Sequence, residues 1–341
     1  MAAPPAAPEV SVVFLAYNQE AYVAEAVRSV LAQTEVRAEI ILSDDASTDR
    51  TYALMSAAAE AYRGPHTVVV RRNQSNQGID HIVQVVELAR ADVMVMAHGD
   101  DVSEPQRCRR LLDVLNATGA YVASSNYLEI DAGGHALGLG QPAGEARPLT
   151  AEDLADLGWR PWLFGASLAW RRAVYTEFPR LAAAYLPIGH DTLVPFRGAV
   201  LGGLAYLPEP LLRYRRHPRQ WSHQLHDHSA PEAWRESQYS AAMMPRLAME
   251  RDLRHLLAQP HRAAPAERDR LAALHQRVVA RILLLNAEWV GVRQTLYRQG
   301  WRPTWVRRET FAQTGRLHGL GALRETGRNL YRRLRWQLFR R

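Results

Sequence analysis

The sequence predicts an α/β fold in which a mainly parallel central sheet is flanked by helices. Short apolar runs alternate with helical segments of about 10 to 15 residues in the first hundred positions, which is the order of βαβ units. The runs are continuously apolar, as expected of strands that are buried on both faces. Polar or acidic residues stand where these runs end, and parallel sheets bind ligands beyond the carboxyl ends of their strands. A ligand site is therefore expected at that edge.

Four strands are predicted in the first hundred residues. The first is the run VSVVFL at 10–15, which stops at AYNQ and is followed by a helical pattern over 20–34. The segment 38–62 repeats the order of strand, acidic turn and helix. The segment 66–101 adds a third strand, a loop, a helix and a fourth strand that ends in MVMAHGDD.

The pattern becomes less regular after residue 121. The Gly-rich stretch DAGGHALGLGQPAGE predicts a surface loop. Helices are predicted at TAEDLADLGW and DTLVPFRGAVLGG, a strand at LLRYRRHP, and a long helical region at 231–298. We therefore predict a disordered tail at 1–8, the α/β domain at 9–228, an α-helical extension at 229–300 and a basic amphipathic segment at 301–341.

The positive charge of the chain is confined to this last segment. The net charge is +7, but residues 301–341 hold eleven arginines and two glutamates, so they carry +9 and the other 300 residues carry −2. The main body is not basic, and nucleic acid is not an expected partner. Leucines recur near one helical face of the segment, at positions 320, 323, 330, 334 and 338. Such a segment lies on an anionic membrane surface, or it packs its leucines on the protein and leaves its arginines in water.

Composition indicates a globular protein of a reducing compartment. Hydrophobic residues make up 47% of the chain, which is enough to fill a core. No apolar run reaches the length of about 18 residues expected of a membrane-spanning helix, and the first residues lack the order of a secretory signal. The single cysteine, Cys108, excludes an internal disulfide and a cysteine-rich metal site. We predict a cytoplasmic location, with peripheral attachment at the inner membrane face if the basic segment binds lipid.

Nucleotide binding is predicted by the residues that follow the first two strands. The glycine fingerprints of dinucleotide enzymes and of P-loop NTPases are missing, which excludes those two classes. Tyr17 can stack on a base, however, and a carboxylate of SDDASTD can accept a base N–H. The alternative is that DASTD only begins the following helix, with Ser47 or Asp49 as its N-cap.

The adjacent carboxylates Asp100 and Asp101 follow the fourth strand. They are hard oxygen ligands, suited to Mg2+ or Mn2+, and such an ion usually completes its shell with water and substrate phosphates. The alternative is a solvated turn that leads to a helix starting near Pro105.

Two further candidates stand in the second half of the chain. Asp191 precedes an apolar helical segment, so it is either a helix cap or a general base that removes a proton from an attacking hydroxyl. His217 follows Arg213, Arg215 and Arg216, which suggests a phosphate environment, although a lone histidine is commonly structural.

Taken in order, these motifs resemble those of family 2 glycosyltransferases of the GT-A fold, over residues 10–222. AYNQ looks like the family's Tyr-Asn turn, and SDDASTD looks like its nucleotide-binding Asp-Asp-Gly-Ser-Thr-Asp turn. NQSNQGI resembles its Asn-x-Gly loop, and HGDD resembles its Asp-x-Asp metal motif. The segment from GHDTLVPF to LLRYRRH is similar to the part that carries the catalytic Asp and ends in a His near the diphosphate.

The resemblance implies a role for each matching residue. The donor nucleotide would be bound by Tyr17, Asp44, Asp45, Asn76, Gly78 and Asp100. The divalent metal ion, Mg2+ or Mn2+, would be bound by Asp101, by Asp100 and by His217. Asp191 would be the catalytic base. Gly165 and His190 would line the pocket for the acceptor and the donor sugar.

The implied activity is metal-dependent, inverting transfer of a sugar from a nucleotide-diphosphate donor to an acceptor hydroxyl. A UDP-sugar is the favoured donor, and a glycan or lipid-linked acceptor implies a role in polysaccharide or cell-surface glycan assembly. Three departures from the family pattern stand out: Ala46 replaces Gly, His190 replaces the usual Glu before the base, and HIVQV replaces a segment that commonly carries Arg-Asn.

Two alternatives remain open at this point. A catalytically silent protein of the same fold would act in surface-glycan assembly through its basic tail, and it would release no nucleotide from any donor. A sugar-phosphate nucleotidylyltransferase would use a similar sheet and metal, but its Gly-rich, Arg/Lys-containing opening loop is missing where AYNQ stands.

Overall fold

The computed structural model describes residues 7–78, 80–140, 149–157, 163–181, 190–220, 231–259 and 263–298, with the side chains of 231–241 and 289–298 excepted. The chain divides into two compact units, residues 1–278 and 279–341. All of the sheet lies in the first unit, and the second is described only for residues 279–298. The predicted tail at 1–8, of which residues 7 and 8 are described, stays a prediction. The predicted basic segment at 301–341 lies outside the described residues.

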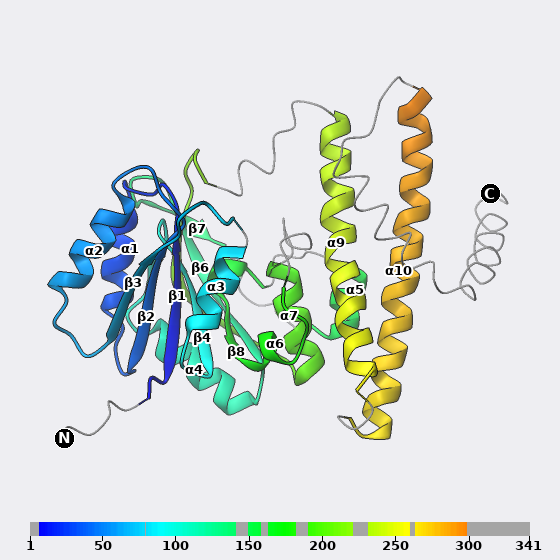
Figure 1. Ribbon diagram of the computed structural model, residues 1–341, viewed down its shortest axis with the longest axis horizontal. Coiled ribbons are helices and arrows are strands. Elements are labelled where there is room, and N and C mark those ends of the chain that lie inside the picture. The colour runs from blue at the N-terminus through cyan, green and yellow to red at the C-terminus, as the bar shows by residue number, and fades with distance from the viewer. Residues whose placement is uncertain are drawn as a thin grey trace. The chain divides into compact units, whose positions relative to one another are not determined.

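The first four strands form the parallel half of the sheet (Figure 1). Each is a short apolar run, and the strands lie side by side in the order β3-β2-β1-β4. β1 pairs in parallel with β2 along its whole length and with β4 from Val10 to Leu15. The strands are β1 (Val10–Ala16), β2 (Ala38–Asp44), β3 (Thr67–Arg72) and β4 (Val93–His98).

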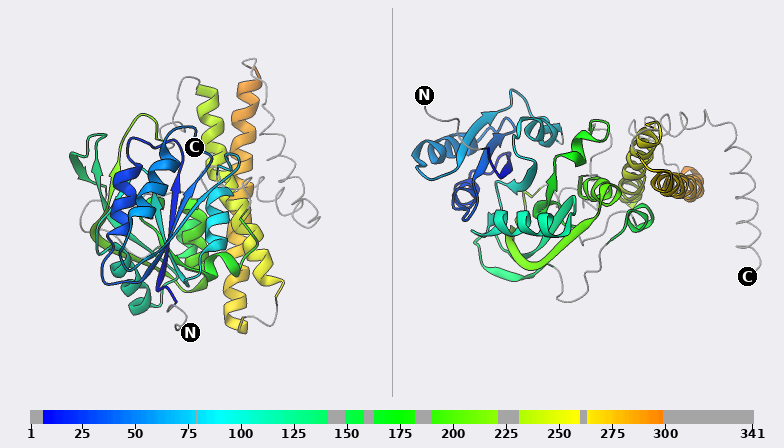
Figure 2. Two further views of the ribbon diagram at one scale, coloured as in Figure 1. Left: turned by 60° about the vertical axis from the view of Figure 1, so that its left-hand side comes forward. Right: turned by 90° about the horizontal axis from the view of Figure 1, so that it is seen from below.

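Helices cover both faces of this half, as Figures 1 and 2 show. The amphipathic helix α1 buries Val23, Ala26, Val27 and Val30 against alternate residues of the strands. Residues of α2 and α4 join the same core, while α3 packs on the opposite face, against β1. The helices are α1 (Val23–Leu31), α2 (Thr51–Ala61), α3 (Asp80–Leu88) and α4 (Arg107–Thr118).

The second half of the sheet is mixed, so the expectation of a mainly parallel sheet holds only for the first half. The short strand β8 pairs antiparallel with β4 and with β6, while β9 pairs parallel with β6. Together the described residues form a nine-stranded sheet. The remaining strands are β5 (Val102–Ser103), β6 (Val122–Ile130), β7 (Ala136–Leu139), β8 (Ala169–Arg171) and β9 (Leu204–Arg215).

The Gly-rich stretch after residue 131 is a hairpin and not the predicted loop, as far as residue 140. β7 pairs antiparallel with β6, and Gly134 and Gly138 have φ of 90° and 153°. Glycine tolerates the left-handed region that such a tight return requires. The glycine content that predicted a loop thus belongs to the tight return of this hairpin.

The predicted helices of the second half are all present in the described residues. TAEDLADLGW contains α5 (Ala151–Leu157), DTLVPFRGAVLGG contains α7, and the long helical region is divided into two helices. These are α7 (His190–Leu201), α9 (Pro231–Leu257) and α10 (Pro265–Arg298), preceded by the short α6 (Ala173–Thr176) and by a 3-10 turn at Gly165–Ser167.

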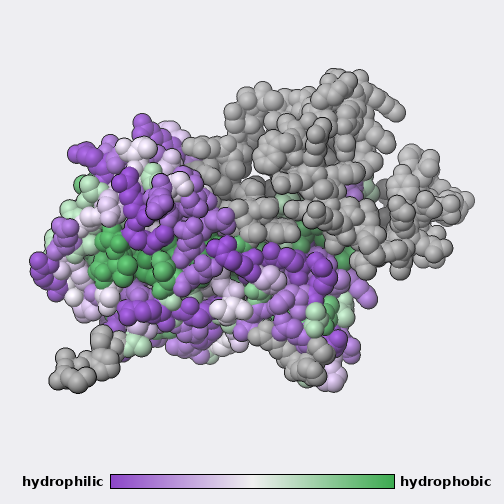
Figure 3. All heavy atoms as spheres, in the orientation of Figure 1, coloured by the Kyte–Doolittle hydropathy of each residue, from purple (hydrophilic) through white to green (hydrophobic). Residues whose placement is uncertain are grey.

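The surface of the sheet domain is mainly polar. Figure 3 shows hydrophilic side chains over most of its visible face, with apolar ones gathered near the edge strand β3, where Val69 is 40% exposed. Within the residues that the structure describes, no helix combines the length and the apolarity needed to cross a membrane.

Candidate active site

The candidate site lies at the carboxyl ends of β1, β2 and β4, which the parallel register brings to one edge. The N–H of Asp45 donates to the carbonyl of Ala16 (2.9 Å), and the N–H of Gly99 donates to the carbonyl of Leu15 (3.0 Å). These bonds join the three strand ends. A Cβ on Gly99 would stand 2.4 Å from Oε1 of Gln19 and 3.0 Å from Cβ of Ala16, so the strand end is closely packed at this position.

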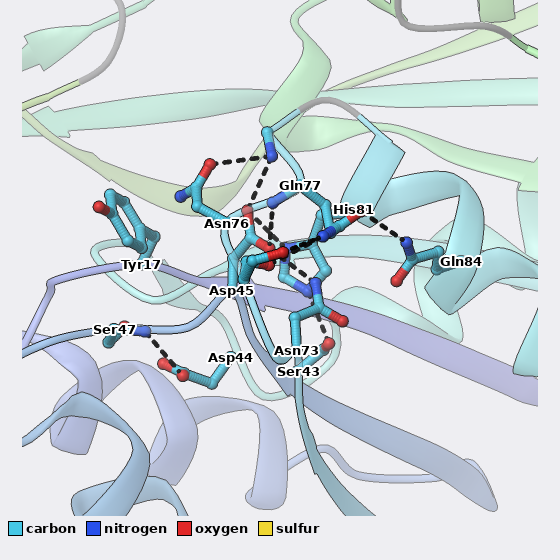
Figure 4. Close-up of polar contacts among 12 residues, drawn as sticks. Tyr17, Ser43, Asp44, Asp45, Ser47, Asn73, Asn76, Gln77, His81 and Gln84 are labelled. Carbon is cyan, nitrogen blue, oxygen red and sulfur yellow. Dashed lines mark hydrogen bonds and ion pairs between the residues drawn. The ribbon is translucent and has the colours of Figure 1, made fainter.

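The turn after β1 leaves Tyr17 open to a ligand. Asn18 has φ of 51°, and its Oδ1 accepts the N–H of Thr48 (2.8 Å) while its own N–H donates to Oγ of Ser47 (2.9 Å). The two loops are thus bound to each other, and the Tyr17 ring stands to one side of the cluster in Figure 4. The side chain is 46% exposed, as a platform for a base requires.

The Asp44 carboxylate lies behind the turn. It is fully buried, and its Oδ2 accepts the N–H of Ser47 (2.9 Å) and lies 3.2 Å from Nε of Arg72. Its Oδ1 has no hydrogen-bond partner in the described part of the chain. These contacts hold the turn in place, so Asp44 supports the neighbouring carboxylate, and its predicted contact with the donor stays a prediction.

The predicted N-caps of the next helix are wrong. α2 begins at Thr51 with Arg50 as its N-cap residue. Ser47 instead accepts from Asn18, and Asp49 binds the N–H of Thr51 through Oδ1 (2.9 Å) and that of Glu20 through Oδ2 (3.1 Å). The motif therefore forms a turn that is hydrogen-bonded to the loop after β1. A residue that only capped α2 would not make that connection.

Ala46, which stands where the related motif has Gly, lies in the left-handed region with φ of 63°. An L-residue there costs roughly 1–2 kcal/mol, and glycine gives back roughly 0.5–1 kcal/mol of backbone entropy. We expect Ala46→Gly to raise the free energy of unfolding by about 0.5–1 kcal/mol in urea denaturation. The control is Ala57→Gly, at an exposed position inside α2, which should lower it by about 1 kcal/mol. Equal losses in both variants would contradict the left-handed turn.

Asp45 holds the loop that follows β3, as Figure 4 shows. Its Oδ1 accepts Nδ2 of Asn73 (2.6 Å) and the N–H of Gln77 (2.9 Å), and its Oδ2 accepts the N–H of Gly78 (3.0 Å). Asn76 adds a bond from the Gly78 N–H to its Oδ1 (3.1 Å). The predicted nucleotide residues Asp45, Asn76 and Gly78 are thus brought together, with the carboxylate as the centre of the loop.

A neutral histidine, His81, lies next to the Asp45 carboxylate. Oγ of Ser43 is 2.6 Å from Nε2 of His81, and Arg71 donates to the same Oγ (2.7 Å). Burial lowers the pKa of His81 to about 4, so the ring is uncharged near neutral pH. Its Nδ1 faces Oδ2 of Asp45 at 3.9 Å, which favours a proton on Nδ1, and Ser43 then donates to Nε2.

Asp100 and Asp101 sit in a turn that one buried arginine fixes. Nε of Arg215 donates to the carbonyl of Asp100 (3.0 Å), and the N–H of Arg215 donates to Oδ1 of Asp101 (3.0 Å). Its guanidinium pairs with Glu25 (2.6 Å) and lies over the ring of Tyr22. Both aspartates are buried at this edge, which rules out the alternative of a solvated turn.

Each of these two aspartates has a histidine neighbour. Nε2 of His217 lies 3.1 Å from Oδ2 of Asp100, and Nδ1 of His98 lies 3.7 Å from Oδ2 of Asp101. Burial, and then the charge of Asp100, raises the pKa of Asp101. Burial opposes protonation of His98, yet its contact with Asp101 and the charges of three carboxylates raise its pKa. Asp191 is one of the three, so negative charge converges here.

The metal ligands predicted from the sequence fit a divalent ion in chemistry but do not form a complete cage. Among the side chains that the structure describes, no group of three or more His, Cys, Asp or Glu is placed to hold a metal. Carboxylate oxygens are nevertheless the ligands that Mg2+ prefers, and one or two of them commonly suffice when substrate phosphates complete the shell. Asp101 and Asp100 meet that description.

The arginines that suggested a phosphate environment are paired with glutamates. Nε of Arg213 lies 2.7 Å from Glu104, and Nη2 of Arg216 lies 3.0 Å from Glu129. Arg215 is buried with Glu25, as described above. In the part of the chain that the structure describes, these three arginines therefore bind carboxylates of the protein itself.

Asp191 stands in the first turn of α7 and meets Gly165 of the 3-10 turn. A Cβ on Gly165 would lie 1.9 Å from Oδ1 and 2.8 Å from Oδ2 of Asp191, so the carboxylate occupies the space of the missing side chain. The Asp191 side chain is 38% exposed and can reach a ligand. The structure thus brings together two predicted residues that are 26 positions apart.

We expect Gly165→Ala to displace this carboxylate. Misplacement of a reacting group by about 1 Å can cost roughly 100-fold in rate, so we expect a loss of about that size in kcat. Steady-state kinetics should show it with the dissociation constant of the donor nucleotide unchanged. Ala166→Gly, a neighbour whose Cβ is only removed, is the control, and equal activity of both variants would contradict the contact.

Sequence reasoning did not single out His98 or the structural roles of Arg71 and Arg215. His98 is the last residue of β4 and stands two positions before Asp100, so its place in HGDD was a usable signal. The burial of Arg215 had no such signal, because an arginine at the end of a strand normally reaches solvent.

Comparison with known proteins agrees with the motif order. The family model described as "Glycosyl transferase family 2" matches residues 11–176. An uncharacterized glycosyltransferase of a Nostoc species is 28% identical over 214 residues, which are 61% of this chain and 65% of that protein. The succinoglycan biosynthesis protein ExoO of Rhizobium meliloti is 31% identical over 140 residues, 41% of this chain and 39% of that protein. The match thus spans less than two thirds of each relative.

Among solved structures, S. aureus TarS 1-349 in complex with UDP-GlcNAc is similar in fold. The TM-score is 0.53 at 15% sequence identity, and the match covers 82% of this chain and 83% of that chain. The predicted GT-A fold is confirmed.

Proposed function

We propose that this chain, whose residues 11–176 match the model of glycosyltransferase family 2, transfers a sugar from a nucleotide-diphosphate donor to an acceptor hydroxyl with inversion. The observation that carries the proposal is the Asp191 carboxylate, which lies against Gly165 and is partly exposed, together with the buried Asp100–Asp101 turn after β4. A base and an anionic turn at one edge are what such a transfer needs.

In the proposed reaction the acceptor oxygen attacks the anomeric carbon while the bond from that carbon to the diphosphate oxygen breaks. Asp191 takes the proton of the hydroxyl, and the electron pair of the broken bond leaves with the nucleotide diphosphate. Attack from the side opposite the leaving group inverts the anomeric centre. Holding both partners at attack distance contributes up to roughly 7–11 kcal/mol in favourable cases.

Tyr17 and the Asp45 loop would position the base of the donor, for which a UDP-sugar is our first candidate. Asp101 and Asp100, with His217 beside them, would hold Mg2+ or Mn2+. Such an ion would offset the negative charge of the diphosphate. The excess of carboxylates around His98 supports a cation at this position.

The acceptor class is proposed from a relative. ExoO is named for succinoglycan biosynthesis, which supports a glycan or lipid-linked acceptor in polysaccharide or surface-glycan assembly. The basic segment at 301–341 would then bring the enzyme to an anionic membrane. Deleting the chain from residue 315 should abolish binding to anionic liposomes, and unchanged binding would leave the segment without that role.

The test is a panel of nucleotide sugars with Mg2+ or Mn2+, scored by slow release of the nucleotide. We expect release from one donor class by the intact enzyme and none by Asp101→Ala. The control is Asp113→Ala, which removes an exposed carboxylate of α4. If every donor stays intact with both metals, the silent-protein alternative replaces our proposal.

A further inference from the structure

His190, the residue before the proposed base, is held by a tyrosine. It opens α7, is 7% exposed, and its Nε2 lies 2.9 Å from the hydroxyl oxygen of Tyr175 in α6. The ring of Trp170 meets the imidazole edge-on, with centroids 5.6 Å apart. A flip of the imidazole would lose the contact between Nε2 and Tyr175.

The two neighbours of His190 together favour one tautomer. Burial raises the pKa of Tyr175, so the hydroxyl stays protonated, but a hydroxyl both donates and accepts, and its contact with Nε2 fits either tautomer. The carboxylate of Asp191 lies on the Nδ1 side of the ring and favours a proton there. In that tautomer the Tyr175 hydroxyl donates to the bare Nε2.

Nδ1 of His190 faces the proposed base, 3.9 Å from Oδ1 of Asp191. That distance is longer than a hydrogen bond, so the N–H acts on the carboxylate through its dipole. Gly165 lies on the same side, because its missing Cβ would be closer to Oδ1 than to Oδ2. Oδ1 thus lies nearer to Gly165 than Oδ2 does, and it is the oxygen that Nδ1 of His190 faces.

We propose that Tyr175 and His190 form a positioning pair, in which Tyr175 donates to Nε2 of the Nδ1–H tautomer of His190 and His190 anchors Oδ1 of Asp191. Oδ2 is then the oxygen that takes the proton of the acceptor hydroxyl. The proposal rests on the proposed transferase function, because it assigns an orientation to the base of that reaction. Neither Tyr175 nor His190 touches the reacting atoms.

The tautomer can be read without any activity. In protein labelled with 15N-histidine, the two ring nitrogens of a neutral imidazole give distinct shifts for the protonated and the bare nitrogen. We expect the His190 ring, assigned by its loss in His190→Asn, to be protonated on Nδ1 in the wild type. We expect Tyr175→Phe to weaken that preference. A wild-type ring protonated on Nε2 would overturn the proposal.

Two substitutions at position 190 distinguish an effect on the orientation of Asp191 from an effect on packing against Tyr175. The amide of His190→Asn stands where Nδ1 stands and keeps a donor toward Asp191, whereas the longer amide of His190→Gln replaces Nε2 and keeps only the partner of Tyr175. We expect His190→Gln to lower kcat about tenfold, the size of one lost interaction with a charged group. We expect His190→Asn to keep most of kcat, with the donor dissociation constant unchanged in both variants.

The reverse order, with the glutamine variant the more active, would mean that His190 only packs against Tyr175, and the proposal would fail. Failure of the proposed function looks different. In that case the wild type transfers no sugar to any acceptor, while the 15N spectrum still reports the tautomer.

Discussion

Asp191→Asn is expected to lower kcat for sugar transfer by about 10²–10⁴-fold, the usual contribution of a positioned general base. The amide has nearly the same shape as the carboxylate and fits the space above Gly165. It cannot accept the proton of the acceptor hydroxyl, so only the chemical step should suffer. The measurement is single-turnover transfer from the donor that the nucleotide-sugar panel identifies.

The dissociation constant of the donor nucleotide is the internal control, because Tyr17 and the Asp45 loop do not touch Asp191 in the described contacts. Asp113→Asn, on the surface of α4, is the matched control for the removal of one charge. A variant Asp191→Asn that turns over like the wild type would refute the base assignment, even if the chain proves to be a transferase.

The parallel half of the sheet was predictable because each of its strands is a continuous apolar run that ends at a polar turn. The mixed half was harder. β6 contains Ser124, Ser125 and Asn126, and all three are buried, at 0%, 2% and 2% exposure. A buried polar run breaks the apolar pattern on which a strand prediction depends. Only tertiary pairing with β8 and β9 shows that the segment is a strand.

The candidate site was predictable as a set of residues but not as a set of contacts. Asp44 and Asp45 are neighbours in sequence, yet one is buried behind the turn and the other organises a loop some 30 positions away. The meeting of Gly165 with Asp191 likewise depends on where the fold places the 3-10 turn relative to the first turn of α7. The order of the motifs along the sequence identifies such residues. Their individual roles can be assigned only from their side-chain contacts.

His81 and His190 have the same arrangement of neighbours around their rings. Nε2 of His81 is hydrogen-bonded to the hydroxyl of Ser43, Nε2 of His190 is hydrogen-bonded to that of Tyr175, and each ring has Nδ1 3.9 Å from an aspartate oxygen. A neutral ring with a fixed tautomer orients a carboxylate without adding a formal charge. At Asp45 this arrangement supports a loop, and at Asp191 it supports the proposed base. His190, which stands where the family usually has Glu, would thus orient the proposed base.

Asp252→Asn is expected to lower the free energy of unfolding by about 3–5 kcal/mol, since it leaves a buried arginine without its counter-charge. Arg197 and Asp252 are both fully buried, and Nε and Nη2 of the arginine donate to the two carboxylate oxygens (2.6 and 3.1 Å). The pair joins α7, which carries Asp191, to α9. Urea denaturation measures the loss.

The control is Glu267→Gln, which breaks a pair with Arg270 that is about 40% exposed on both sides and should cost less than about 1 kcal/mol. The double variant Arg197→Met/Asp252→Leu separates charge from shape, because an apolar pair carries no desolvation cost. It should recover most of the stability that Asp252→Asn loses. If it recovers stability but lowers kcat, the ion pair serves to place α7 and its base. If Asp252→Asn costs no more than Glu267→Gln, the pair does not hold α9 to the domain as described.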